Sequence, residues 1–102
     1  MAIQKITKDN FNEFIQSDEP VMVDFFATWC ESCKFMTPIL EKIEASEANN
    51  RIGMLDVDDY RELAVEHGVK SIPTLMVFKN GEVQSTSVGR KSRDEVVEML
   101  AK

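Results

Sequence analysis

Residues 21–34 read VMVDFFATWCESCK and carry most of the information about fold class and chemistry. The first half, residues 21–27, is β-branched, aromatic and apolar on both faces, which predicts a buried central strand. The second half ends in a C-x-x-C motif, Cys30 and Cys33, where the strand gives way to a helix. Apolar side chains at helical spacing predict that this helix continues well beyond the motif, and Pro38 inside it predicts a kink.

Strands and helices alternate along the rest of the chain. The expected strands are residues 1–7, 21–27, 52–57, 75–78 and 83–88. The expected helices are residues 8–17, 30–46, 60–67 and the segment that follows residue 92. This order, β-α-β-α-β-α-β-β-α, predicts an α/β fold with a central mixed β-sheet and helices on both of its faces. Because no linker or repeat interrupts the chain, we expect residues 1–102 to form a single domain.

Short polar motifs predict where several elements begin or turn. The candidate N-caps of the first and third helices, two for each, are Thr7, Asp9, Asp58 and Asp59. The dipeptide Asn80-Gly81 predicts a tight hairpin between the last two strands. Ser92 and Glu95 form a capping box that begins the last helix.

The composition disfavours several classes of partner and location. The 18 acidic and 12 basic residues give a net charge of −6, so we expect no nucleic-acid or anionic-membrane partner and a soluble monomer. No apolar run approaches the ~20 residues that cross a bilayer, and the first residues lack the pattern of a signal peptide. We therefore expect a cytoplasmic protein, in whose reducing surroundings a structural disulfide would not persist.

The two cysteines are suited to redox chemistry. Cys30 begins a helix, where unpaired N–H groups and the helix dipole favour the nucleophilic thiolate. Cys33 lies one turn further along, so Cys30 would attack a substrate disulfide and Cys33 would resolve the mixed disulfide. A structural disulfide between them would close almost no loop. A zinc site requires four ligands, and the chain offers these two thiols and His67, which we expect to contact the carbonyls at a helix end; we expect no metal.

Two further residues stand out. Asp24 lies in the middle of the apolar strand, where burial would raise its pKa and make it a proton shuttle beneath the cysteines. The alternative is a solvated carboxylate on a sheet edge, which the apolar residues on both faces argue against. Pro73 cannot donate a hydrogen bond to a sheet, so we expect it at the entrance of the strand from Leu75. Whether the bond before Pro73 is cis remains open from the residues alone.

With these residues in place, the chain resembles the thioredoxin family over essentially its full length. The resemblance rests on residues 24–34, Pro38, Ile72-Pro73-Thr74, Asn80-Gly81 and Val88-Gly89. It implies a thioredoxin fold with a cis Pro73 opposite the cysteines. It also implies a thiol-disulfide oxidoreductase with no cofactor beyond its Cys30–Cys33 disulfide. In this reading Cys30 is the exposed nucleophile, Cys33 is the buried resolving thiol, and Asp24 assists proton transfer at Cys33.

The same resemblance implies partners and a binding surface. Client proteins with disulfides would be the substrates, and a reductase of the thioredoxin-reductase type would restore the dithiol. The residues expected to line the groove for the client chain are Trp29, Val57, Ile72, Pro73, Val88 and Gly89.

The chain departs from the family pattern at the active-site dipeptide, where Glu31-Ser32 replaces the usual Gly-Pro. Glu31 places a negative charge beside the Cys30 thiolate and opposes its formation, and Lys34, one turn further on, partly offsets this. The dipeptide leaves two alternatives open: a specialised thiol oxidant or isomerase, and a non-catalytic thioredoxin-like binding module.

Two other departures concern the surroundings of Asp24. Phe26 stands where many members of the family have a second tryptophan, and Met54 aligns with the lysine that commonly neighbours the buried aspartate. Because a nearby cation would favour the carboxylate, we expect Asp24 to hold its proton to a higher pH than in a relative with that lysine.

Overall fold

Five strands form one mixed sheet in a computed structural model that describes residues 3–48 and 51–101. The strands are β1 (Gln4–Lys5), β2 (Val21–Phe26), β3 (Ile52–Asp56), β4 (Thr74–Lys79) and β5 (Glu82–Val88). The helices are α1 (Phe11–Ile15), α2 (Glu31–Ile43), α3 (Arg61–Glu66) and α4 (Arg93–Ala101), and a π-helical turn, η1 (Glu44–Ala48), continues α2. The predicted alternation of strands and helices is confirmed, whereas the π-helical turn was expected to be α-helix.

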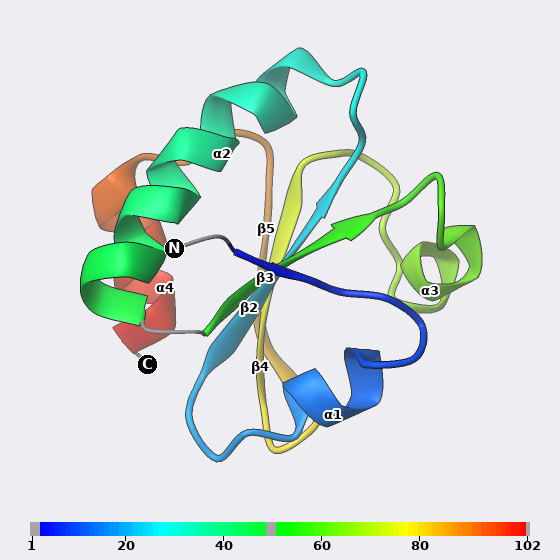
Figure 1. The fold of residues 1–102 in the computed structure, drawn as a ribbon, viewed down its shortest axis with the longest axis horizontal. Coiled ribbons are helices and arrows are strands. Elements are labelled where there is room, and N and C mark those ends of the chain that lie inside the picture. The colour runs from blue at the N-terminus through cyan, green and yellow to red at the C-terminus, as the bar shows by residue number, and fades with distance from the viewer. Residues whose placement is uncertain (1–2, 49–50, 102) are drawn as a thin grey trace.

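The strands lie in the order β1-β3-β2-β4-β5, so β2 is the central strand (Figure 1). It pairs in parallel with β3 and antiparallel with β4, which makes the sheet mixed, as predicted. Its first five residues are buried, because neighbouring strands cover both edges and helices cover both faces. The loop that carries the cysteines therefore leaves the most enclosed strand of the molecule.

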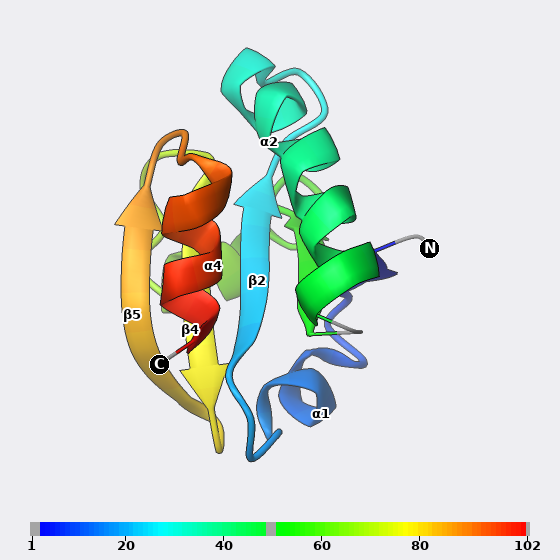
Figure 2. The ribbon, with the colours of Figure 1, turned by 90° about the vertical axis from the view of Figure 1, so that its left-hand side faces the viewer.

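Helices cover the two faces of the sheet in pairs (Figures 1 and 2). Side chains of α2 and α4 pack on one face, around Met22 of β2, and side chains of α1 and α3 pack on the other, around Val23 and Phe25. Because side chains alternate along a strand, Asp24 shares the α2 face with Met22. The sheet thus directs Asp24 toward the helix that begins at the cysteines.

The N-cap predicted for the first helix is wrong. Asn10 is the N-cap of α1, and its side chain makes no capping hydrogen bond. Instead, the Asn10 Oδ1 accepts a hydrogen bond from the Thr7 N–H at 2.8 Å, and the Thr7 hydroxyl accepts one from the Asp9 N–H at 3.1 Å. These polar side chains therefore stabilise the turn before the helix rather than its first turn.

The N-cap predicted for the third helix is also wrong. Tyr60 is the N-cap of α3, and no side chain caps this helix. The Asp58 N–H donates a hydrogen bond to the Asp56 carboxylate at 2.8 Å, and the Asp58 carboxylate binds a residue of the active-site loop, as described below.

The C-terminal signals are confirmed. Asn80 and Gly81 both have positive φ, 53° and 83°, which is the requirement of the tightest hairpin turn and explains the Asn-Gly pair between β4 and β5. Ser92 and Glu95 form the capping box of α4: the Ser92 N–H donates to the Glu95 carboxylate at 2.8 Å, and the Glu95 N–H donates to the Ser92 hydroxyl at 3.2 Å.

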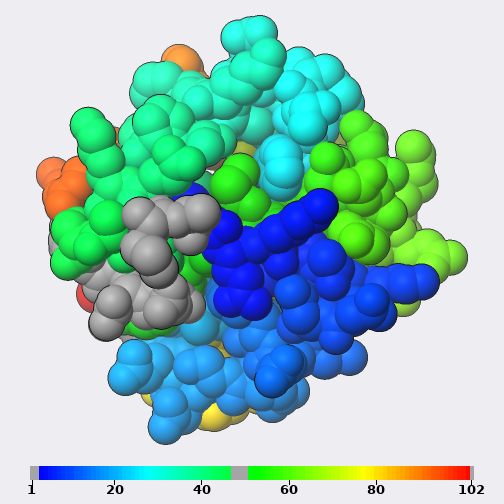
Figure 3. Space-filling view, viewed as in Figure 1, coloured from blue at the N-terminus to red at the C-terminus, as the bar shows by residue number. Residues whose placement is uncertain are grey.

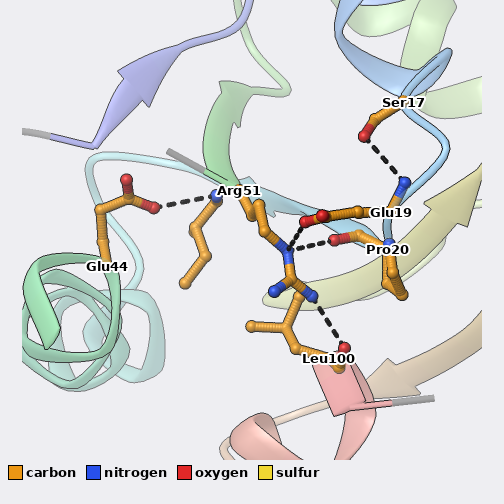
Figure 4. A network of polar contacts seen from close by, with 7 residues as sticks. Ser17, Glu19, Pro20, Glu44, Arg51 and Leu100 are labelled. Carbon is orange, nitrogen blue, oxygen red and sulfur yellow. Dashed lines mark hydrogen bonds and ion pairs between the residues drawn. The ribbon is translucent and has the colours of Figure 1, made fainter. Parts of the chain in front are cut away.

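Arg51 connects three parts of the chain that are distant in sequence (Figure 4). Its Nε donates a hydrogen bond to the Pro20 carbonyl at 2.7 Å, and its Nη2 donates to the Leu100 carbonyl at 2.9 Å. The Glu19 carboxylate lies 4.0 Å from the same Nε. One guanidinium therefore holds the start of β2 and the end of α4 beside β3.

We expect Arg51→Met to lower the free energy of unfolding by about 1–3 kcal/mol, because the Pro20 and Leu100 carbonyls lose a charged donor while the apolar stem remains. Urea unfolding measures the loss, and amide exchange in the last turn of α4 should accelerate. Lys42→Met, which removes an exposed cation from α2, is the matched control. Equal stability of the two variants would contradict the prediction.

Candidate active site

The two thiols lie at the beginning of α2, directly after the loop that follows β2. Cys30 is the N-cap of α2, and its Sγ accepts a hydrogen bond from the Cys33 N–H at 3.1 Å. Both cysteines are free thiols and cluster with Ala27, and the partly buried Val57 and Ile72 pack against them. The helix N-terminus thus places a hydrogen-bond donor on the Cys30 sulfur.

The two thiols differ in exposure less than the resemblance implied. Cys30 is 7% exposed and Cys33 is 1% exposed. The expectation of an exposed Cys30 is therefore wrong in degree, although Cys30 remains the more accessible thiol. The large exposed side chain of the loop is Trp29, at 66%. A disulfide that reaches Cys30 must approach beside that indole.

Cys33 holds its proton strongly in the reduced protein. Burial raises the pKa of the Cys33 thiol to about 12, and its hydrogen bond with Cys30 and the charges of Cys30 and Asp24 also raise this pKa. Because Cys33 is protonated at neutral pH, it becomes a nucleophile only when a base takes its proton.

Asp24 is a carboxyl group with the properties of such a base. It is completely buried, and neither of its oxygens has a hydrogen-bond partner among the described residues. Burial raises the pKa of Asp24 from 3.8 to about 7. The alternative of a solvated edge carboxylate is wrong, because β2 is the central strand.

The neighbours of Asp24 across the sheet explain why no cation balances it. In the register, Asp24 lies beside Met54 of β3 on one side and Leu75 of β4 on the other. Met54 in turn pairs with the exposed Lys5 of β1, which is therefore two strands away from Asp24. An apolar side chain thus occupies the sheet position beside the buried carboxylate.

Of the dipeptide between the cysteines, Glu31 is exposed and Ser32 is half-buried. Glu31 is the first residue of α2, and its carboxylate lies 3.7 Å from the Lys34 Nζ, with both side chains exposed. Lys34 therefore pairs with Glu31. Water screens an exposed pair of this kind, so it modulates the charge beside Cys30 only weakly.

Part of the predicted binding set lies in one groove beside the cysteines. Trp29, Val57 and Ile72 line a groove of about 560 Å³. The groove lies between the active-site loop and α3, which Figure 3 shows side by side in cyan and green at the upper right of the molecule. Its other lining residues are Asp58, Arg61, Ala64, Val65, Val69, Lys70 and Ser71.

The remaining predicted binding residues lie outside this groove. The Ile72–Pro73 peptide bond is cis, as the resemblance implied, and the Pro73 carbonyl accepts a hydrogen bond from the Gly89 N–H at 2.8 Å. Pro73 is buried, whereas Val88, which pairs with Thr74, is 56% exposed. Pro73, Val88 and Gly89 are therefore neighbours of one another, and none of them lines the groove of Trp29.

The sequence did not indicate the role of Asp58 in this site. The Trp29 indole N–H donates a hydrogen bond to the Asp58 carboxylate at 2.8 Å and so fixes the ring at the mouth of the groove. The two residues are 29 positions apart, so no local pattern connects them. The tryptophan beside the motif was the available signal, because its indole N–H is a hydrogen-bond donor.

His67 is a structural residue, as expected. Its Nδ1 lies 2.9 Å from the Leu63 carbonyl, and its ring packs against Phe11 at a centroid distance of 4.9 Å. Within residues 3–48 and 51–101, no group of three or more potential ligands is placed to hold a metal ion. None of the helices in these ranges is long and apolar enough to cross a membrane.

A C-x-x-C dithiol at the start of a helix, above a buried carboxyl group, defines a thiol-disulfide oxidoreductase. The chain belongs to the thioredoxin family, because the family's sequence model, described as Thioredoxin, matches residues 2–102. It is therefore a thioredoxin-type disulfide oxidoreductase, and the mixed sheet with its flanking helices is the thioredoxin fold. Membership implies a reductase and client proteins as partners.

Similar proteins agree over nearly the whole chain. The thioredoxin of Chlamydia caviae is 40% identical over 98 residues, which cover 96% of this chain and 95% of that protein. The thioredoxin of Bacillus subtilis is 42% identical, and the alignment covers 100% of this chain and 98% of that protein. A Malassezia sympodialis thioredoxin structure superposes with a TM-score of 0.86 at 33% identity, covering 98% of this chain and 89% of that one.

The raised pKa of Asp24 predicts how stability depends on pH. Between about pH 4 and pH 7 the folded protein keeps a proton on Asp24 that the unfolded chain has lost, so the free energy of unfolding falls as pH rises. Above pH 7, the free energy of unfolding is lower than it is near pH 4 by at most about 4 kcal/mol. Asp24→Asn should remove this slope and be more stable than the wild type at pH 8, as measured by urea unfolding.

Asp18→Asn is the control for this experiment, because Asp18 is exposed. It should keep the wild-type dependence on pH. A wild-type slope in Asp24→Asn would show that Asp24 does not titrate in this range.

Met54→Lys should lower the pKa of Asp24 below about 7, because a cation beside the carboxylate favours its charged form. Carboxyl NMR titration of Asp24 measures the change, and Met54→Gln provides a neutral polar control. The same pKa in the wild type and in Met54→Lys would refute the role given to the apolar neighbour.

Proposed function

We propose that this protein reduces disulfides of client proteins, with Cys30 as the nucleophile and Cys33 as the resolving thiol. The observation that carries this assignment is the Cys33 N–H, 3.1 Å from the Cys30 sulfur at the start of α2. The Cys30 thiolate attacks one sulfur of the client disulfide, that bond breaks, and the other client sulfur leaves as a thiolate. Cys30 and the client are then joined by a mixed disulfide.

The second step requires a change at Cys33. Part of the rise in the Cys33 pKa comes from the hydrogen bond and the charge of Cys30. Both contributions disappear once the Cys30 sulfur is bonded to the client, so the Cys33 pKa falls. The first step therefore prepares the second thiol for reaction.

Asp24 accepts the proton of Cys33. Its oxygens have no other described partner, and with a pKa of about 7 a large fraction of it is ionised at neutral pH. The Cys33 thiolate attacks the Cys30 sulfur, the Cys30–Cys33 disulfide forms, and the second client sulfur leaves and takes up a proton. Two electrons have then passed from the dithiol to the client.

The cycle closes when a reductase of the thioredoxin-reductase type restores the two thiols. In the proposed cycle the chain acts in the cytoplasm as a monomeric single domain, residues 1–102, with no cofactor beyond its own disulfide. Trp29, Val57 and Ile72 receive the client beside Cys30. Pro73, before β4, and Val88 and Gly89, at the end of β5, form the other side of the approach. Glu31 and Ser32 adjust the stability of the Cys30 thiolate.

Reduction of insulin disulfides with dithiothreitol as the electron donor tests the thiol roles. Cys30→Ser should abolish catalysis because it removes the nucleophile. Cys33→Ser should lower turnover at least about 100-fold and accumulate a mixed disulfide between Cys30 and the client, detectable by mass spectrometry. Ser46→Ala, at the far end of the α2–η1 helix, is the control and should keep wild-type turnover.

Equal rates for the wild type and Cys33→Ser would contradict the dithiol mechanism and favour a binding module. A separate equilibrium with glutathione distinguishes a reductant from an oxidant, because an oxidant would leave Cys30 and Cys33 predominantly reduced in a glutathione buffer.

A further inference from the structure

The groove beside the cysteines combines an apolar lining with two cations. Its apolar residues come from the start of the chain segment that follows β3, from α3 and from the loop before β4: Val57, Ala64, Val65, Val69 and Ile72. Val57 and Ile72 also pack against the cysteine cluster, so the groove leads directly to Cys30. An extended segment lying in the groove would therefore carry a disulfide to the nucleophile.

The charged side chains of the groove are not balanced by one another. Arg61 and Lys70 line it, both are exposed, and neither forms an ion pair in the part of the chain that the structure describes. Asp58 also lines it and accepts the Trp29 indole N–H, a neutral donor that leaves the carboxylate charge in place. Two cations without partners therefore face the groove.

These cations stand out against the rest of the molecule, whose net charge is −6. The groove lining, with the two cations Arg61 and Lys70 against the one carboxylate Asp58, is net positive, which is opposite in sign to the charge of the whole protein. A carboxylate in the groove would find a charge partner there, whereas a basic side chain would meet Arg61 and Lys70 with the same sign.

We propose that this groove selects client segments in which acidic side chains accompany apolar ones beside the disulfide, with Arg61 and Lys70 pairing with the carboxylates. The inference rests on the proposed function, because it assigns a substrate class to the same reaction. The valine, alanine and isoleucine side chains that line the groove contact the apolar part of the client segment. Arg61 and Lys70 distinguish acidic segments from neutral and basic ones.

The test uses three peptide disulfides of identical length and apolar content, with two aspartates, two asparagines or two lysines beside the cysteine. The kcat/KM for reduction of each peptide is measured at low ionic strength, since screening weakens exposed pairs. The wild type should reduce the aspartate peptide about fivefold faster than the asparagine peptide, and the lysine peptide should be slowest. Because the readout is a ratio between peptides, a change in the amount of folded protein cancels.

Arg61→Gln/Lys70→Gln should bring the aspartate-to-asparagine ratio close to one. The control Lys42→Gln/Lys79→Gln removes the same charge from the end of α2 and from the β4–β5 hairpin, and it should keep the wild-type ratio. The proposal would be overturned if the wild type reduced the aspartate and asparagine peptides with the same kcat/KM. It would also be overturned if both double variants lost the preference for the aspartate peptide to the same extent. If instead no peptide is reduced at all, the proposed function itself fails.

Discussion

The active site depends on the burial of one carboxyl group without a partner. Asp24 lies in the central strand beside the apolar Met54 and Leu75, and among the described residues its carboxyl oxygens have no hydrogen-bond donor. This arrangement costs stability at neutral pH and raises the Asp24 pKa to about 7. In the proposed mechanism, the same burial provides a carboxyl group, partly ionised at neutral pH, that accepts the proton of Cys33. The fold thus loses stability at Asp24, the residue to which the proposed mechanism assigns the proton of Cys33.

The rest of the fold compensates for the stability lost at Asp24 and connects β2 to the two cysteines. Packed side chains surround β2 on both faces, and Arg51 joins the start of β2 to the end of α4. The end of β2 then leads into the loop that sets Cys30 at the start of α2. One strand thereby positions Asp24 and leads to Cys30, and one helix end positions both thiols.

The sequence predicted those parts of the structure that rest on local patterns. The apolar run of β2, the C-x-x-C motif and the Asn80-Gly81 turn each indicate their structure within a few residues. The predictions failed where a distant residue decides the outcome. Asp58 has the sequence signature of a helix cap, but its carboxylate binds the indole of Trp29, 29 residues away. The family resemblance named three residues of the groove, Trp29, Val57 and Ile72, but the contribution of α3 was inaccessible, because α3 and the active-site loop meet only in the folded chain.

The most direct test of Asp24 as the base is the pH dependence of the resolving step alone. In single-turnover experiments, a preformed mixed disulfide between Cys30 and a client peptide releases the peptide when Cys33 attacks. The wild-type release rate should rise with pH through an inflection near 7, the pKa of Asp24. Asp24→Asn should release the peptide more slowly at neutral pH, with that inflection absent. A wild-type rate and inflection in Asp24→Asn would contradict the proposed transfer of the Cys33 proton to Asp24.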